Sequence, residues 1–246
     1  MRRLILLAAA FAVLLGASGG AAWWFLVRED NKLATSAPDI PDDLVHATAS
    51  ATPAGTAPAT EDATAGDAVT YQINADLSEA AYFVDEELAS IGLPSTAKGT
   101  TNDIEGQFEL TADGSALVDG ETSSFTVDLT NLTSDESRRD GRVQDALETS
   151  QFPTATFTIS SVTGYDPAVP EGEEQELQLI GTLDLHGVQR EVTWDVKAKR
   201  EGDVISALAT LTVSFADFDI TAPTFGGLVS ISDEATLQVQ LIAQAV

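Results

Sequence analysis

The stretch from Leu177 to Ala198 constrains the fold most, because apolar side chains recur at every second position on both sides of His186-Gly187. A period of two places alternate side chains on opposite faces of a β-strand. The remaining positions carry polar residues such as Asp184 and Asp195. Gly187 can adopt the positive φ that a tight reversal often needs. The stretch therefore predicts a β-hairpin with one apolar face and one solvent-facing face.

The same periodicity continues beyond this hairpin and predicts an all-β domain over residues 69–246. Clusters of Gly, Pro, Asn and Asp separate the apolar runs, as expected for strands joined by turns. Besides the two arms of the hairpin, the expected strands are Val69–Asn74, Ala81–Glu87, Ile104–Ala112, Ser124–Leu129, Thr154–Val162, Ile205–Phe215 and Ala235–Ala243. About eight strands without a βαβ rhythm indicate an antiparallel sandwich or barrel.

Two segments interrupt the strand pattern. Ala89–Thr96 is expected to form a loop or a short helix, and Ser134–Ser150 is the best candidate helix of the domain. Ser134 or Asp135 can cap the N-terminus of this helix. Gly141 weakens its centre, so we expect the helix to be short or broken. Three apolar side chains are spaced to face the barrel, namely Val143, Ala146 and Leu147.

Residues 1–30 are expected to form a membrane anchor or a signal segment. Two arginines precede 24 uncharged residues, Leu4–Val27, and a helix of that length covers roughly 36 Å, enough for a hydrocarbon core of about 30 Å. A cleaved signal peptide, leaving a secreted or periplasmic protein, would use Leu4–Leu15 as its apolar core and Gly16–Ala22 as its cleavage region. Trp23 and Trp24 extend the apolar run and favour an uncleaved, single-pass anchor. The arginines and the acidic remainder place the N-terminus inside and the domain outside the membrane.

Residues 31–68 are expected to form a disordered linker. The segment Ala34–Asp67 is rich in Ala, Thr and Pro, and it lacks Lys, Arg and aromatic residues. Such a composition cannot bury enough apolar surface to offset the entropy lost on ordering. A flexible chain of this length spans on the order of 30 Å. His46 lies within it and is expected to be solvated.

Composition excludes several partners and chemistries. The net charge of −27 argues against binding of nucleic acid and against adhesion of the folded domain to anionic lipid. The absence of Cys excludes disulfides, a thiolate nucleophile and Cys-ligated metals. His186 lacks a G-x-S-x-G partner and is expected to be an exposed turn residue. The acidic clusters Asp85–Glu87 and Glu171–Glu176 lack the spacing of a Ca²⁺ loop and are expected to be solvated. We therefore expect no catalytic residues, no metal and no cofactor.

Alternation cannot tell a barrel filled by side chains from one that holds a ligand. Small side chains at inward positions leave room, and Ala207 and Ala209 occupy such positions between Ile205 and Phe215. This favours a cavity. The inward apolar residues would then be the candidate ligand-binding set, which is Phe83, Phe108, Phe125, Phe157, Leu183, Trp194, Leu211 and Phe215.

Several short blocks follow one another between about Val69 and Ala243. They are Tyr71-Gln72-Ile73 with Ser78 and Tyr82-Phe83-Val84, Gly106-Gln107-Phe108, Ser124–Leu129, the residues Asp140, Arg142 and Leu147, Phe152–Phe157, Gly181–Val188 with Val192-Thr193-Trp194, and Ala216–Ile220 with Pro223. Each block alone is weak, but together they resemble the YceI-like family of lipid- and polyisoprenoid-binding proteins. The resemblance implies an eight-stranded antiparallel barrel of lipocalin type, an apolar pocket for a long isoprenoid or acyl chain, and an extracytoplasmic bacterial location.

The chain departs from this resemblance at one place. Many members carry a basic or His-containing stretch after the second strand, where this chain has Asp85-Glu86-Glu87-Leu88. If that site helps to hold the head group of a ligand, the acidic residues favour a neutral or cationic head, or another ligand altogether.

Three functions follow as hypotheses. The first is a non-enzymatic binding protein for a long-chain amphiphile, held outside the membrane by Leu4–Val27 and serving transport, storage or sequestration. The second is a surface interaction module with a filled barrel core, which would use loops such as Ala89–Thr96 and Pro223–Val229 with its apolar Phe225-Gly226-Gly227-Leu228. The third is an enzyme acting on a lipid inside the barrel, for which no activated nucleophile is visible. Formation of a homodimer is left open.

Overall fold

The computed structural model describes residues 31–48, 68–88, 93–111, 116–118, 123–223 and 229–246. The predicted anchor Leu4–Val27 lies outside these ranges, as do residues 89–92 and residues 224–228, which include the apolar part of the predicted interaction loop. Across the described ranges, no helix is both long and apolar enough to cross a membrane. The chain divides into two compact units, Met1–Asn31 and Lys32–Val246, and only the second is described below.

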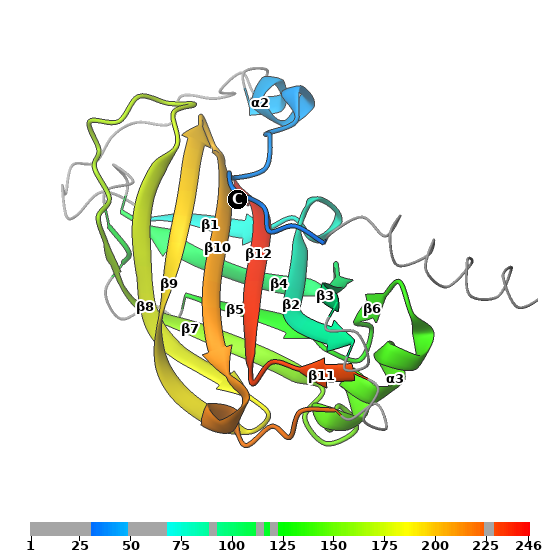
Figure 1. Ribbon diagram of the computed structural model, residues 1–246. Helices are drawn as coiled ribbons and strands as arrows, with labels where there is room; N and C mark the ends of the chain where they lie inside the picture. The colour runs from blue at the N-terminus through cyan, green and yellow to red at the C-terminus, as the bar shows by residue number, and fades with distance from the viewer. Residues whose placement is uncertain (1–30, 49–67, 89–92, 112–115, 119–122, 224–228) are drawn as a thin grey trace, which may run out of the picture. The chain divides into compact units, whose positions relative to one another are not determined.

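The second unit is built on a closed antiparallel barrel of eight strands, which bends around an apolar interior (Figure 1). In ring order the strands are β1 (Val69–Ile73), β4 (Ile104–Leu110), β5 (Ser124–Asp128), β7 (Thr154–Thr163), β8 (Gln175–Leu185), β9 (Val188–Glu201), β10 (Val204–Ser214) and β12 (Glu234–Ala245). Pairing of Tyr71 with Ala245 joins β1 to β12 and closes the ring. The expectation of an antiparallel barrel is therefore confirmed, and the sandwich is excluded.

The first half of β12 has a second partner, which extends the sheet beyond the ring. It pairs with β2 (Glu79–Leu88), and β3 (Leu93–Thr101) and the short β6 (Thr133–Ser134) follow in order. The three-residue β11 (Val229–Ile231) also pairs with β2. Helix α3 (Ser137–Ala146) contacts β6 and lies beside this extension, at the lower right of Figure 1.

The prediction of a loop or short helix at Ala89–Thr96 is wrong for its described part. Leu93–Thr96 belong to β3, which pairs with β2 along its whole length. The sequence of β3 is mostly polar and shows no apolar alternation, so periodicity gives no signal for it. Backbone pairing with β2 forms the strand instead, because each backbone N–H and C=O needs a partner.

Helix α3 is shorter than the predicted Ser134–Ser150, and its cap differs from the prediction. Glu136 is the N-cap residue, and its side chain accepts a hydrogen bond from the backbone N–H of Arg138. The hydroxyl of Ser134 instead bonds the carboxylate of Asp140, which also accepts from the Ser134 N–H at 2.8 Å. The helix continues through Gly141 without a break.

The hairpin that dominates the sequence pattern forms as predicted. Strands β8 and β9 pair along their length, and His186 and Gly187 form the two-residue reversal with φ of 55° and 71°. Two consecutive positive φ angles are those of a type I′ turn, whose twist matches paired strands. A side chain at Gly187 would also come within 2.5 Å of the Phe152 ring. Both the positive φ and the lack of space therefore require glycine at this position.

His186 is a turn residue, as predicted, but it is half-buried rather than exposed. Its Nδ1 atom lies 2.9 Å from the carbonyl oxygen of Phe218, and its ring packs against Phe152 with centroids 4.9 Å apart. These contacts fix the turn against a neighbouring segment, which gives His186 a structural role.

Part of the expected linker is ordered on the outer wall of the barrel. We call residues Ala34–Asp39 the strap, and the helix α2 (Asp42–Thr48), which includes His46, follows it. The Gln238 amide bonds both the N–H and the C=O of Ala34, at 2.9 and 3.0 Å. The hydroxyl of Ser206 donates to the carbonyl of Pro38, and Ala37 is buried. The prediction of disorder did not anticipate the ordered strap, because it considered only the apolar surface that the segment can bury. Side chains of β10 and β12 instead form hydrogen bonds with the strap's backbone.

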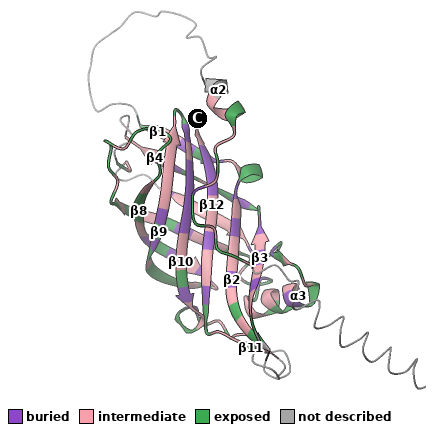
Figure 2. Ribbon diagram, turned by 45° about the horizontal axis from the view of Figure 1, so that its top comes forward, coloured by how far each residue is buried: buried purple, intermediate pink, exposed green. Residues whose placement is uncertain are grey.

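The pattern of buried residues reflects the core inside the barrel and the strap outside it. Buried residues run along β10 and β12 (Figure 2), and β10 is buried on both faces from Ser206 to Ala209. Ala207 and Ala209 face the barrel interior, whereas Ser206 lies under the strap. The inner face therefore belongs to the barrel core, and the outer face is shielded by a segment that precedes it in the chain.

Candidate functional site

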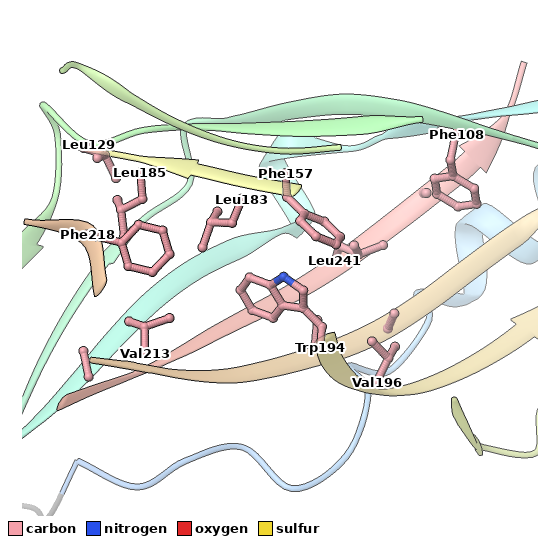
Figure 3. Close-up of a cluster of buried hydrophobic side chains, with 14 of the residues drawn as sticks. Phe108, Leu129, Phe157, Leu183, Leu185, Trp194, Val196, Val213, Phe218 and Leu241 are labelled. Carbon is pink, nitrogen blue, oxygen red and sulfur yellow. The ribbon is translucent and has the colours of Figure 1, made fainter. Parts of the chain in front are cut away.

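The barrel interior contains a cavity of about 210 Å³. Its walls come from strands on both sides of the ring and from α3, and they are almost entirely apolar. Phe157 of β7 and Trp194 of β9 pack against each other inside the barrel with ring centroids 5.9 Å apart, and Leu183 and Leu241 lie beside them (Figure 3). The interior is therefore not filled by side chains, which answers the question that alternation leaves open.

Five of the eight candidate ligand-binding residues line this cavity. They are Phe125, Phe157, Leu183, Trp194 and Phe215. The predicted small positions Ala207 and Ala209 also lie in its wall, as do all three apolar residues of the helix region, Val143, Ala146 and Leu147. Alternation thus identified residues on several sides of the wall, although a role in binding stays a prediction for each residue.

The other three candidates lie elsewhere. Phe108 belongs to the core and stacks on Tyr71 with ring centroids 5.4 Å apart, but neither residue of this pair lines the cavity. Leu211 packs against the core without lining the cavity. Phe83 is buried, but its neighbours Tyr82 and Val84 line the cavity, so the side chain of Phe83 faces the opposite side of β2.

A group of polar side chains in the wall was missed from the sequence. We call Tyr82, Glu86 and Arg139 the polar corner; all three line the cavity, and Glu86 and Arg139 are the charged side chains among its described lining residues. The expectation that Glu86 is solvated is wrong, since its side chain is only 10% exposed. The neighbouring Asp85 and Glu87 are exposed, as expected.

Ion pairing holds the polar corner together. The Nη2 atom of Arg139 lies 3.4 Å from Oε2 of Glu86, and Nη1 donates to Asp135, which is half exposed. Burial alone would lower the pKa of Arg139, but the carboxylates of Glu86 and Asp135 outweigh burial and raise this pKa above its ordinary value. The guanidinium therefore stays charged inside an apolar wall.

The phenol of Tyr82 stays neutral over the physiological range. Burial raises the pKa of Tyr82 to about 12, and the positive charge of Arg139 opposes this rise. The ring of Tyr82 lies over Gly99, its partner on β3, where a side chain would come within 2.3 Å of the ring. Glycine at this position makes room for the aromatic ring in the cavity wall.

Two buried N–H groups of the cavity wall lack an acceptor among the described residues. They are Nε of Arg139 and Nε1 of Trp194, in side chains whose residues are 7% and 6% exposed. Figure 3 shows the indole nitrogen of Trp194 on the side of Phe157, inside the barrel. Most buried donors in proteins are paired, so two orphans in one cavity wall are unusual.

Among the described residues, no group of three or more His, Asp or Glu side chains is placed to hold a metal ion. The charged groups of the wall are paired with one another. The arrangement is suited to the burial of an apolar chain, with a few polar atoms at one end.

Comparison with known proteins gives a consistent assignment. The family model of the YceI-like domain matches residues 71–243. The protein YceI of Escherichia coli O157:H7 is 29% identical over 141 residues, which cover 56% of this chain and 68% of that protein. The protein YceI of Salmonella arizonae is 28% identical over 142 residues, with 57% and 68% covered.

Two solved structures resemble the fold. A polyisoprenoid binding domain from Saccharophagus degradans, implicated in plant cell wall breakdown, superposes with a TM-score of 0.54 at 20% identity and covers 72% of this chain and 98% of its own. BcnA of Burkholderia cenocepacia superposes with a TM-score of 0.53 at 18% identity and covers 70% and 99%. At these identities the likeness concerns the fold alone.

Proposed function

Because this chain belongs to the YceI-like domain family, we propose that it is a non-enzymatic binding protein that holds a long-chain amphiphile, a polyisoprenoid or a fatty-acid-like lipid, inside its barrel. The observation that carries the proposal is the apolar cavity of about 210 Å³. Such a cavity favours a hydrocarbon chain, because burial of each CH₂ group contributes about 0.8 kcal/mol. The polyisoprenoid binding domain of S. degradans shares this fold and supports the choice of ligand class.

The cellular setting is part of the same proposal. The uncharged segment Leu4–Val27 and the two arginines before it support a single-pass anchor with the barrel in an extracytoplasmic compartment. There the protein would transport, store or sequester its ligand. The alternative of an interaction module assumed a filled core, and the cavity removes the observation that would favour it.

Two phenylalanine variants of β10 test the proposal. Ala209→Phe places a ring in the cavity, whereas Thr212→Phe places the same ring on the exposed outer face of the same strand. If the ring displaces about three methylene groups of a ligand, the loss is about 2.4 kcal/mol, or a factor of about 50 in affinity. Thr212→Phe is expected to bind as the unaltered protein does.

The measurement is native mass spectrometry of the full chain, first as purified from cells and then with an added polyprenol or hexadecanoate. We expect a copurified or added lipid on the unaltered protein and on Thr212→Phe, and a strong loss on Ala209→Phe. An unaltered protein that is free of lipid and ignores both additions would refute the proposal. Equal binding by all three proteins would place the ligand outside the cavity.

A further inference from the structure

The charged side chains among the described lining residues of the cavity, Glu86 and Arg139, lie together where the end of β2 meets α3. Wall residues from β8 and β9, such as Leu183 and Val196, are apolar. Arg139 bonds Asp135, and the side chain of Asp135 is 43% exposed, so the guanidinium lies one side chain away from solvent. An amphiphile with its chain in the barrel would therefore have its head group at the polar corner.

Both orphan groups of the wall are hydrogen-bond donors. The Nε atom of arginine and the Nε1 atom of tryptophan each carry a hydrogen and cannot accept. A buried donor without an acceptor is unfavourable, and a ligand that supplies an acceptor relieves this cost. A pure hydrocarbon offers none, so Arg139 and Trp194 point to a ligand that carries oxygen.

The charges around Arg139 indicate which kind of oxygen atom the ligand carries. The single cation of the polar corner, Arg139, is already paired with Glu86 and Asp135, and Asp140 adds a third carboxylate close enough to affect the ionisation of Tyr82. An anionic head group would therefore enter a region whose fixed charge is already negative. A carbonyl oxygen accepts a hydrogen bond without adding a charge.

We propose that the polar corner receives an uncharged carbonyl oxygen of the ligand's head group, bound by the Nε–H of Arg139, and that it discriminates against a carboxylate on the same chain. This inference rests on the proposed function, because a head group reaches the corner only when its chain occupies the cavity. The acidic sequence of β2 left open a neutral or a cationic head group, and this inference selects the neutral one.

Four probes with the same sixteen-carbon chain test the inference on the full chain by competition in native mass spectrometry. They are methyl hexadecanoate, hexadecanoate, hexadecylamine and hexadecane. We expect methyl hexadecanoate to bind about tenfold more tightly than hexadecanoate, because the carboxylate would lie beside the negative charges of Glu86 and Asp135. It is also expected to bind more tightly than hexadecylamine and hexadecane.

A pair of variants on β2 locates the preference. Glu86→Gln keeps the shape of the polar corner and removes one negative charge, so the preference for the ester over the carboxylate is expected to fall to about threefold or less. Glu87→Gln removes the same charge from the exposed face of the strand and is expected to keep the tenfold preference.

The outcomes separate the two proposals. Equal binding of all four probes would retain the cavity as a lipid site and overturn the head-group inference, as would tighter binding of the carboxylate or the amine. Failure of every probe, hexadecane included, would refute the proposed function itself. An unchanged preference in Glu86→Gln would show that the polar corner does not set it.

Discussion

Replacing Arg139 with methionine is expected to destabilise the protein by about 3–5 kcal/mol, because it leaves the carboxylate of Glu86 buried without a cation. Both side chains are nearly inaccessible, at 8% and 10% exposed, so solvent hydrates neither charge well. Asp135 remains beside the substituted position, but it is 43% exposed and can be hydrated. The cost therefore arises mainly from Glu86.

The magnitude follows from the geometry of the pair. At the observed 3.4 Å separation and an effective dielectric constant of about 20, the attraction between Arg139 and Glu86 is about 5 kcal/mol. Desolvation of both charges offsets much of this attraction in the intact protein. Removing both together, in Arg139→Met with Glu86→Leu, should consequently bring stability back to within about 1 kcal/mol of the unaltered protein.

Urea unfolding of the two single variants and the double variant measures this coupling. Glu86→Leu is expected to cost about 1–2 kcal/mol, because Arg139 keeps Asp135 as a partner, and the coupling energy should be at least about 3 kcal/mol. Arg138→Met, which alters the exposed neighbour on α3, is the control and should stay within about 0.5 kcal/mol. A double variant as unstable as Arg139→Met would refute the reasoning.

Three further predictions concern other parts of the barrel. The neutral phenol of Tyr82, whose pKa is raised from 10.0 to about 12, supports stability fully below pH 10, and this support is lost as the pH rises towards 12. Tyrosinate absorbance should show the late ionisation, and Tyr82→Phe should reduce its amplitude and leave the contribution of Tyr71, whose pKa burial also raises. Ser206→Ala leaves the Pro38 carbonyl without its donor and is expected to cost about 1 kcal/mol; hydrogen exchange should accelerate in the strap, and unchanged exchange would contradict this. Gly181→Ala brings a methyl group to 2.1 Å from the Thr158 carbonyl and should destabilise by about 2 kcal/mol or more; an unchanged melting temperature would show that the backbone adapts freely.

The strands of the barrel are predictable where one face is apolar and the other polar, as in the β8–β9 hairpin. Only one orientation of such a strand buries its apolar side chains. The face of β2 is not predictable in this way, since Ala81, Tyr82, Phe83 and Val84 are all apolar. The structure places Tyr82 inward and Phe83 outward, with the Lys98 ammonium 5.6 Å from its ring. The local sequence pattern therefore does not determine which of these two side chains faces the interior.

The polar corner could not be predicted from the sequence, for a different reason. Glu86 lies within an acidic run, and such runs are usually solvated. Its partner Arg139 lies 53 residues further along the chain, on a helix whose position over the cavity depends on the tertiary fold. Periodicity reports which face of an element is buried, but it does not report which distant charge comes to meet it.

Closure of the ring by β12 has a consequence for the order of events during folding. Asn74 and Gln244, whose side chains bond next to the β1–β12 pairing, are 170 residues apart, so bringing their strands together costs more loop entropy than any hairpin of the barrel. While the chain is being synthesised, β1 keeps one unpaired edge until β12 emerges. An unpaired strand edge is a template for association with another chain. The nascent barrel is thus most exposed to misassembly in the interval before its final long strand arrives, and a chaperone that shields this edge would act in that interval.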